Sequence, residues 1–192
     1  MNSPITDTET WELPLITVQD DVLPQIVQEA FTDIYQEWFA QEPMLINHDL
    51  PILVRALRRV ENWRVFLLLT PWMLARVFIP VLEPSETLPI PVPKGWKPSE
   101  RVGKPYTVIG PGVEIAINEA SEKAHINYHT RIGHYFVQPL IQSMESFSSP
   151  EQVFEAWNNV LRVRNENIRK LNRRCRWQED VSRREFFRRA AS

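Results

Sequence analysis

The sequence contains little cysteine and little glycine, and both shortages exclude whole classes of functional site. A single cysteine, Cys175, excludes an intrachain disulfide framework and a cysteine-rich zinc module. With 5 glycines in 192 residues, the chain has neither of the glycine-rich loops that cradle phosphate groups, and it lacks the Gly-x-Ser-x-Gly nucleophile elbow. No catalytic motif remains, so we expect neither enzyme activity nor a cofactor.

Long apolar runs are also missing. The longest apolar stretch, residues 65–75, is interrupted at Thr70 and ends at Arg76, whereas a membrane-spanning helix needs about 20 apolar residues. Residues 1–17 carry acids where a secretion signal needs basic residues followed by an apolar core. We therefore expect a cytoplasmic protein with no membrane span, in which residues 1–17 form a flexible leader.

The net charge of −2 conceals a strong segregation of charge along the chain. Residues 161–192 hold eleven basic and four acidic side chains, a net charge of +7, while residues 1–160 hold eleven basic and twenty acidic ones, a net charge of −9. Such a block of one sign is typical of an interaction tail. The chain is an acidic body that ends in a basic segment.

Three histidines, His125, His129 and His134, lie within ten residues of one another. They fall in a stretch with strand character, where residues four apart share a face but are separated by about 13 Å. That spacing is too wide for one metal ion, so we interpret them as ordinary strand and loop residues and expect no metal site.

The first regular element that the sequence predicts is an amphipathic helix ending near Ala40. Asp20 and Asp21 precede Pro24 and suggest an N-cap. Apolar and aromatic residues then recur at three- and four-residue spacing, which predicts an aromatic face packed in the core. They are Ile26, Val27, Ala30, Phe31, Ile34, Tyr35, Trp38 and Phe39.

The middle of the chain predicts strands. Residues 52–60 and 63–70 form a hairpin around Glu61-Asn62, and residues 72–81 form a further strand. The prolines that crowd residues 80–105 predict an extended surface loop.

A second hairpin is expected from residues 106–109 and 113–118, with its turn at Gly110-Pro111-Gly112. Residues 124–140 continue as one or two strands, bent at Gly133.

A second amphipathic helix is predicted over residues 149–171, because Ser149-Pro150-Glu151 combines an N-cap, a first-turn proline and an early acid. The fold class that follows is α+β: a single domain over residues 18–171, with a mainly antiparallel sheet packed by an N-terminal and a C-terminal helix. Residues 172–192 then form a basic C-terminal tail.

The segment Leu69–Pro80, with its Thr70-Pro71-Trp72 core, resembles the Thr-Pro-Trp segment of the HybE-type nickel–iron hydrogenase assembly chaperones. The order of the other parts is similar too: an N-terminal amphipathic helix, a proline-bearing loop, Gly133-His134-Tyr135, a late helix and a Ser-Arg-Arg tail. The resemblance implies a non-catalytic chaperone that binds the hydrogenase small-subunit precursor, which carries a twin-arginine signal, before export and subunit joining. It also implies that the large subunit or other maturation proteins are partners.

We expect the client to bind at an apolar groove beside the Thr-Pro-Trp segment. Its residues would be Thr70, Pro71, Trp72 and Met73, with Glu83 and Glu86 as an acidic rim for an arginine-rich peptide. Core packing alone would also explain a proline that ends a strand and a tryptophan that follows it.

The tail contains the order Ser-Arg-Arg-x-Phe-Phe of a twin-arginine export signal, followed by only a few residues. Since such signals operate at an N-terminus before an apolar stretch, this one cannot act as an address. One hypothesis is that it mimics the client's signal and occupies the same site. The element comprises Ser182, Arg183, Arg184, Phe186 and Phe187.

The alternative function is a nucleic-acid-binding or regulatory adaptor that uses the basic stretch 162–189. The acidic body would repel a phosphate backbone outside that stretch, so we place nucleic acid second to a protein client.

Overall fold

The computed structural model describes residues 19–42, 46–81, 90 and 92–182, and the side chains of helix α3 as far as Leu171. It divides the chain into two compact units, residues 1–150 and 151–192, each of which is described here by itself. The predicted boundary between domain and tail at residue 171 stays a prediction.

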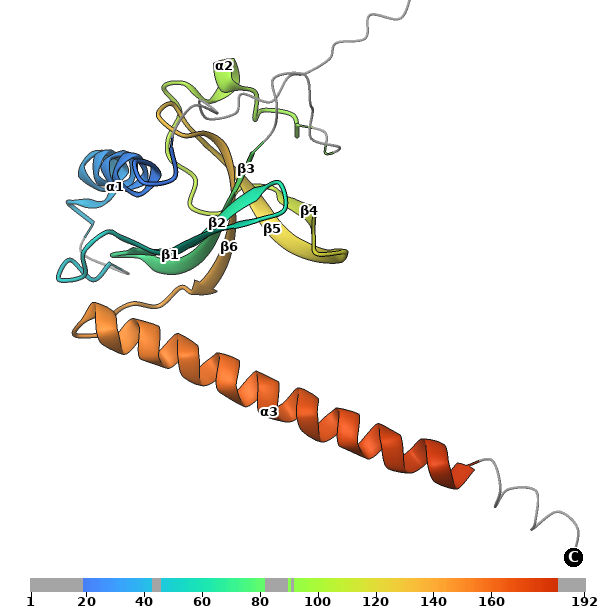
Figure 1. Cartoon of the computed structure of the whole chain (residues 1–192). Coiled ribbons are helices and arrows are strands. Elements are labelled where there is room, and N and C mark those ends of the chain that lie inside the picture. The colour runs from blue at the N-terminus through green and yellow to red at the C-terminus, as the bar shows by residue number, and fades with distance from the viewer. Residues whose placement is uncertain (1–18, 43–45, 82–89, 91, 183–192) are drawn as a thin grey trace, which may run out of the picture. The chain divides into compact units, whose positions relative to one another are not determined.

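The first unit is built on one antiparallel sheet in the order β1-β2-β3-β6-β5-β4 (Figure 1). Each neighbouring pair is antiparallel, and consecutive strands are joined by tight turns except between β3 and β4. This confirms the predicted α+β class. The strands are β1 (Leu53–Val60), β2 (Trp63–Thr70), β3 (Met73–Pro80), β4 (Gly112–Ile117), β5 (Ala120–His129) and β6 (Gly133–Ile141).

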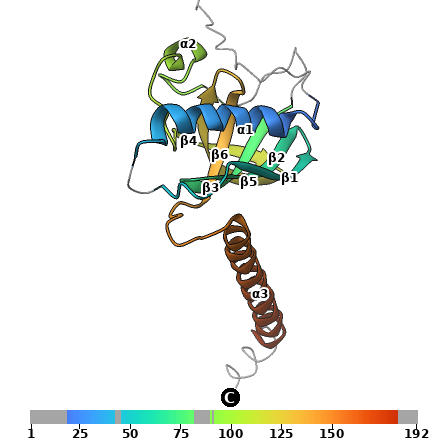
Figure 2. The same cartoon turned by 90° about the vertical axis from the view of Figure 1, so that its left-hand side faces the viewer.

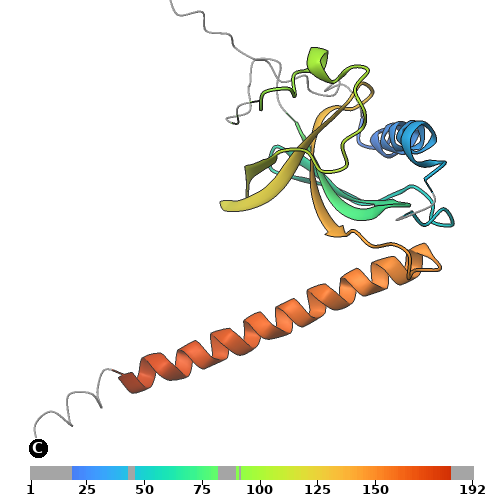
Figure 3. The ribbon, with the colours of Figure 1, turned by 180° about the vertical axis from the view of Figure 1, so that it is seen from behind.

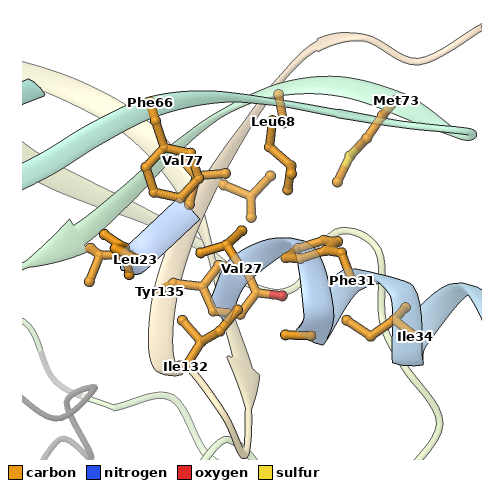
Figure 4. Close-up of a cluster of buried hydrophobic side chains, with 14 of the residues drawn as sticks. Leu23, Val27, Phe31, Ile34, Phe66, Leu68, Met73, Val77, Ile132 and Tyr135 are labelled. Atoms are coloured by element: carbon orange, nitrogen blue, oxygen red, sulfur yellow. The ribbon is translucent and has the colours of Figure 1, made fainter. Parts of the chain in front are cut away.

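Helix α1 (Leu23–Ile34) lies across one face of this sheet and continues as a π-helical segment, η1 (Tyr35–Phe39) (Figure 2). Its buried face meets alternate residues of β2, β3 and β6, as the two-residue period of a strand requires. Figure 4 shows this core closely. It comprises Leu23, Val27, Ala30, Phe31 and Ile34 of the helix with Phe66, Leu68, Trp72, Met73, Ala75, Val77, Ile79, Ile132, Tyr135 and Val137.

The opposite face of the sheet is buried as well, beneath the segment that precedes β4. Trp96 and Val92 from this segment pack against the intervening residues of the same strands, among them Val65, Phe78 and Phe136. Since both faces are covered, β2 and β3 carry nearly continuous apolar sequence instead of alternation. Figure 3 shows the sheet from behind.

Two sequence expectations for this unit are wrong. The second hairpin is formed by β4 and β5, and its turn is Asn118-Glu119, where both residues have positive φ (50° and 62°) as a type I′ turn needs. Residues 106–109 are not a strand. The Gly110-Pro111-Gly112 sequence instead leads into β4, and Pro111 accepts a backbone hydrogen bond from Ile126.

The prolines of residues 80–105 predict an extended surface loop, yet the described part of this segment has one short helical turn, α2 (Pro98–Arg101). Pro98 occupies the first turn, where its missing N–H is harmless, and the Glu100 carboxylate accepts a hydrogen bond from the Lys97 amide. Proline spacing alone does not forbid a helix that begins at a proline.

The second unit contains α3 (Pro150–Ser182), one continuous helix of 33 residues (Figure 1). The predicted C-terminal helix is therefore present and runs beyond residue 171, where the sequence pattern placed its end. Among the described residues, no helix is both long and apolar enough to cross a membrane.

The N-terminus of α1 is anchored by an ion pair and not by the aspartate cap that the sequence suggests. Asp20 accepts hydrogen bonds from Arg59 (2.7 Å) and from Arg64 (2.6 Å), whose side chain is only 2% exposed. The hydrogen bond from Arg59, followed by that from Arg64, lowers the pKa of Asp20 although burial opposes it. Asp20 thus links the start of the helix to β1 and β2.

Replacing Asp20 by asparagine (Asp20→Asn) should lower the free energy of unfolding by about 2 kcal/mol, because the buried Arg64 loses a charged partner. Asp21→Asn, the same change at an exposed neighbour, should have little effect. Denaturant unfolding measures both.

The pH dependence has a definite sign. Asp20 has a lower pKa in the folded chain than its ordinary value of 3.8, so its contribution is complete above about pH 4 and disappears as the pH falls through the folded pKa. The difference between wild type and Asp20→Asn should shrink over that range. A difference that persists in acid would contradict the ion-pair account.

Candidate functional site

The Thr-Pro-Trp segment forms the tight turn between β2 and β3. Thr70 and Met73 face each other across it, and the Thr70 hydroxyl both accepts a hydrogen bond from the Met73 amide and donates one to the Met73 carbonyl, each at 3.1 Å. The Asn47 amide donates to the Pro71 carbonyl at 2.9 Å. Asn47 also donates through its side chain to the carbonyls of Met144 (3.0 Å) and Phe147 (2.6 Å). These bonds hold the turn in one conformation.

Trp72 lies at the centre of an aromatic cluster, which we define as Phe31, Tyr35, Phe39, Trp72, Tyr106 and Tyr135. Its ring stacks on Phe39 with centroids 4.4 Å apart, and on Tyr35 and Phe31 at 6.5 and 6.3 Å. Tyr106 meets it edge-on at 6.5 Å. The wider π-helical turn of η1 lets Tyr35 and Phe39 both lie over Trp72, and such π-helical turns are frequent at functional sites.

Three members of the aromatic cluster carry buried polar atoms that have no hydrogen-bond partner within the described part of the chain: Trp72 Nε1 and the hydroxyls of Tyr106 and Tyr135. Burial raises the pKa of Tyr106 to about 12 and that of Tyr135 well above its usual value. The two hydroxyls are neighbours, and their interaction lowers the pKa of Tyr106 and raises that of Tyr135, although neither atom has a partner in regular hydrogen-bond geometry among the described residues. All three groups are neutral donors without an acceptor, which is uncommon in a folded interior.

Arg101 of α2 adds a fourth such atom, its Nε. Its guanidinium donates to the Pro105 carbonyl at 2.8 Å and lies 4.5 Å from the centre of the Trp96 ring. Its charge is near enough to oppose the rise in the pKa of Tyr135.

The outer side of α1 and η1 is acidic. Glu29, Asp33 and Glu37 follow one another at four-residue spacing, and Arg131 pairs with the first two, at 3.5 and 2.9 Å. Trp38, beside Glu37, is 37% exposed. This helix therefore presents acids and an aromatic ring outward while its inner side covers Trp72.

The structure describes only some of the predicted site residues. Thr70, Pro71, Trp72 and Met73 are together and buried, and Tyr35 and Phe39 of η1 cover Trp72. Glu83, Glu86, Arg183, Arg184, Phe186 and Phe187 lie outside the described residues, and Ser182 is the last residue of α3. That these residues bind a client, or imitate one, stays a prediction.

The histidines serve separate structural contacts. His125 and His134 each bond a backbone carbonyl at 2.8 Å, of Gly110 and Trp96 respectively, and His48 bonds the Tyr35 hydroxyl at 2.7 Å. Burial lowers the pKa of His129. No group of three or more histidine, cysteine, aspartate or glutamate residues suited to a metal ion occurs in the described ranges.

Sequence reasoning did not place Tyr106 and Tyr135 beside Trp72, although Gly133-His134-Tyr135 was part of the family resemblance. Tyr106 comes from a segment interpreted as a strand, and Tyr135 from a strand whose facing could not be assigned before the sheet order was known. The alternation within β6, where Tyr135 and Val137 share a face, was the signal for its position in the core.

The chain is similar to known proteins in sequence and in structure. A family model described as "[NiFe]-hydrogenase assembly, chaperone, HybE" matches residues 23–189. Among solved structures, the chain is similar to the "Solution Structure of HybE from Escherichia coli", with 16% identity, a TM-score of 0.48 and 80% of each chain covered. No curated protein sequence matches the chain.

Replacing Tyr135 by phenylalanine (Tyr135→Phe) should leave the free energy of unfolding unchanged or raise it by at most about 1 kcal/mol, because a buried hydroxyl without an acceptor is removed. Tyr35→Phe is the matched control: it deletes a hydroxyl that bonds His48 and should lower stability by up to about 1 kcal/mol. Thermal and denaturant unfolding compare the two. A large loss for Tyr135→Phe would mean that its hydroxyl is satisfied in solution.

Proposed function

This chain belongs to the HybE family of nickel–iron hydrogenase assembly chaperones, and we propose that it binds the precursor of a hydrogenase small subunit. On this proposal it holds the precursor, including its twin-arginine signal, before export and before the small subunit joins the large one. It does so by binding alone, without catalysing a reaction. The observation that carries the proposal is the family match, which spans residues 23–189 and so includes parts of both units.

The aromatic cluster supports a binding site for an extended peptide. Backbone carbonyls of a peptide are hydrogen-bond acceptors, and the cluster offers the donors Trp72 Nε1 and two tyrosine hydroxyls, which lack acceptors among the described residues. Apolar side chains of the peptide would replace the contacts that η1 makes with Trp72. The proposal thus requires η1 to move aside, and its π-helical geometry is less favourable than a regular α-helix.

Charge supports an arginine-bearing client. Glu37 belongs to η1, and Glu42 follows it, with its carbonyl bonded to His48 at 3.1 Å. Both carboxylates are exposed, and the predicted rim residues Glu83 and Glu86 would add to the same sign. A twin-arginine segment would meet opposite charge when it approaches this helix, which accelerates association and favours the correct partner.

Titration calorimetry of the full chain with a small-subunit precursor, and with the same subunit lacking its signal, tests the proposal. We expect binding of the precursor that weakens as the salt concentration rises. The Glu83→Gln/Glu86→Gln double variant should weaken it about 5-fold, since each exposed ion pair contributes up to about 1 kcal/mol.

Glu114→Gln/Glu119→Gln removes the same charge from exposed positions of the β4–β5 hairpin and should leave the affinity unchanged. Absence of binding by both forms of the subunit would refute the proposed function. If both double variants weakened the binding of the precursor equally, the proposal that Glu83 and Glu86 form an acidic rim for it would be refuted.

A further inference from the structure

Helix α3 carries a row of apolar side chains that are half-buried at Phe154, Trp157 and Leu161 and exposed further along the helix. Val160 is 52% exposed, Ile168 43% and Leu171 59%, and the compact unit to which they belong contains no other described helix or strand. A single helix cannot bury its own apolar stripe. The stripe therefore needs a partner surface.

The spacing of the stripe specifies what kind of surface fits it. Phe154, Trp157, Leu161, Arg164, Ile168 and Leu171 alternate at three and four residues, which is the a/d pattern of a coiled-coil heptad. With this spacing the seam stays on one side of two helices that wind round each other. Only Arg164 interrupts the apolar character.

Between residues 153 and 172, the residues that flank the seam are uncharged. Asparagine recurs at residues 158, 165 and 172, seven residues apart, so it occupies the same flanking position in successive heptads. Apart from Arg164, the charged residues of this span lie at the outward positions, away from the seam. They are Glu155, Arg162, Glu166, Arg169 and Lys170. A helix made for an acidic partner, or for an anionic lipid surface, would carry its basic residues beside the seam, and between residues 153 and 172 this one has none there.

We propose that α3 pairs with α3 of a second copy of this chain in an antiparallel coiled coil. In an antiparallel pair, a positions face d positions, and here this places Leu161 opposite Leu171 of the other copy and Arg164 opposite Ile168. The two-fold axis of this pair passes residue 166, which is also the midpoint of Pro150–Ser182. In this register the two helices therefore lie side by side over their full length of about 50 Å.

Arg164 decides the orientation. In a parallel pair the two Arg164 side chains would face each other across the seam, and like charges there are repulsive. In the antiparallel pair each lies beside Ile168 of the other helix, and its long aliphatic stem can cover that side chain while the guanidinium reaches water. The same arrangement is isologous and closed, as expected of a two-fold dimer, and opposes the two helix dipoles. Asn165 of each copy would flank the centre.

Sedimentation equilibrium of the full chain between about 1 and about 500 μM tests the proposal, because a dimer depends on concentration. We expect a reversible monomer–dimer equilibrium. Ile168→Glu should raise the dissociation constant at least about 100-fold by placing a charge in the seam, and Val163→Glu, at an exposed apolar residue outside the seam, should not.

Arg164→Leu should tighten the dimer about 10-fold, a gain that no loss of folding could imitate. Circular dichroism and the melting temperature of each variant check that the first unit stays folded. A chain that remains monomeric at every concentration would overturn the proposal, as would a dimer that Ile168→Glu leaves intact.

The orientation has its own measurement, through spin labels on Cys175, the sole cysteine. Residue 175 lies across from residue 157 of the other copy in the proposed register, so the two labelled positions are 18 residues, or about 27 Å, apart along the axis. Parallel helices would bring them within about 15 Å. Short distances would overturn the antiparallel arrangement.

Discussion

The stacking of Trp72, in the β2–β3 turn, on the aromatic rings of η1 is the contact on which the arrangement of the first unit depends. Trp72 belongs to the turn, Phe39 and Tyr35 to the helical segment, and Tyr106 to the approach to β4, so one ring joins three parts of the chain. The bonds of Asn47 add a fourth part by fixing the turn to residues 144–147. A ligand that displaced η1 would therefore disturb the whole cluster.

Much of the first unit could be predicted from sequence because its signals are local. The hairpin of β1 and β2, the strand β3 and the helix over residues 23–39 all show the periodicity of their structure. The prediction of the second hairpin was wrong because Gly110-Pro111-Gly112 is a strong turn signal in the sequence, whereas the actual turn, Asn118-Glu119, adopts positive φ without glycine. The prediction of an N-cap at Asp20 was wrong for another reason: two arginines distant in sequence bind its carboxylate, which therefore does not cap the helix.

The candidate site was only half visible in the sequence. The Thr-Pro-Trp segment could be singled out, but not that Trp72 would be buried with an unpartnered N–H, since this depends on which rings surround it. The end of α3 was placed too early because the pattern loses apolar residues after Leu171, although arginine favours a helix nearly as well as alanine does. The heptad spacing of α3, by contrast, is present in the sequence and gains meaning once the helix is continuous and its stripe exposed.

The central claim is that the client is bound at the aromatic cluster. Hydrogen–deuterium exchange of the full chain, alone and with the small-subunit precursor, tests it most directly, because exchange reports local opening of each backbone amide. The account predicts that exchange changes at residues 31–39 and 70–73 when the precursor binds. Unchanged exchange at both segments, with changes confined to other parts of the chain, would contradict it.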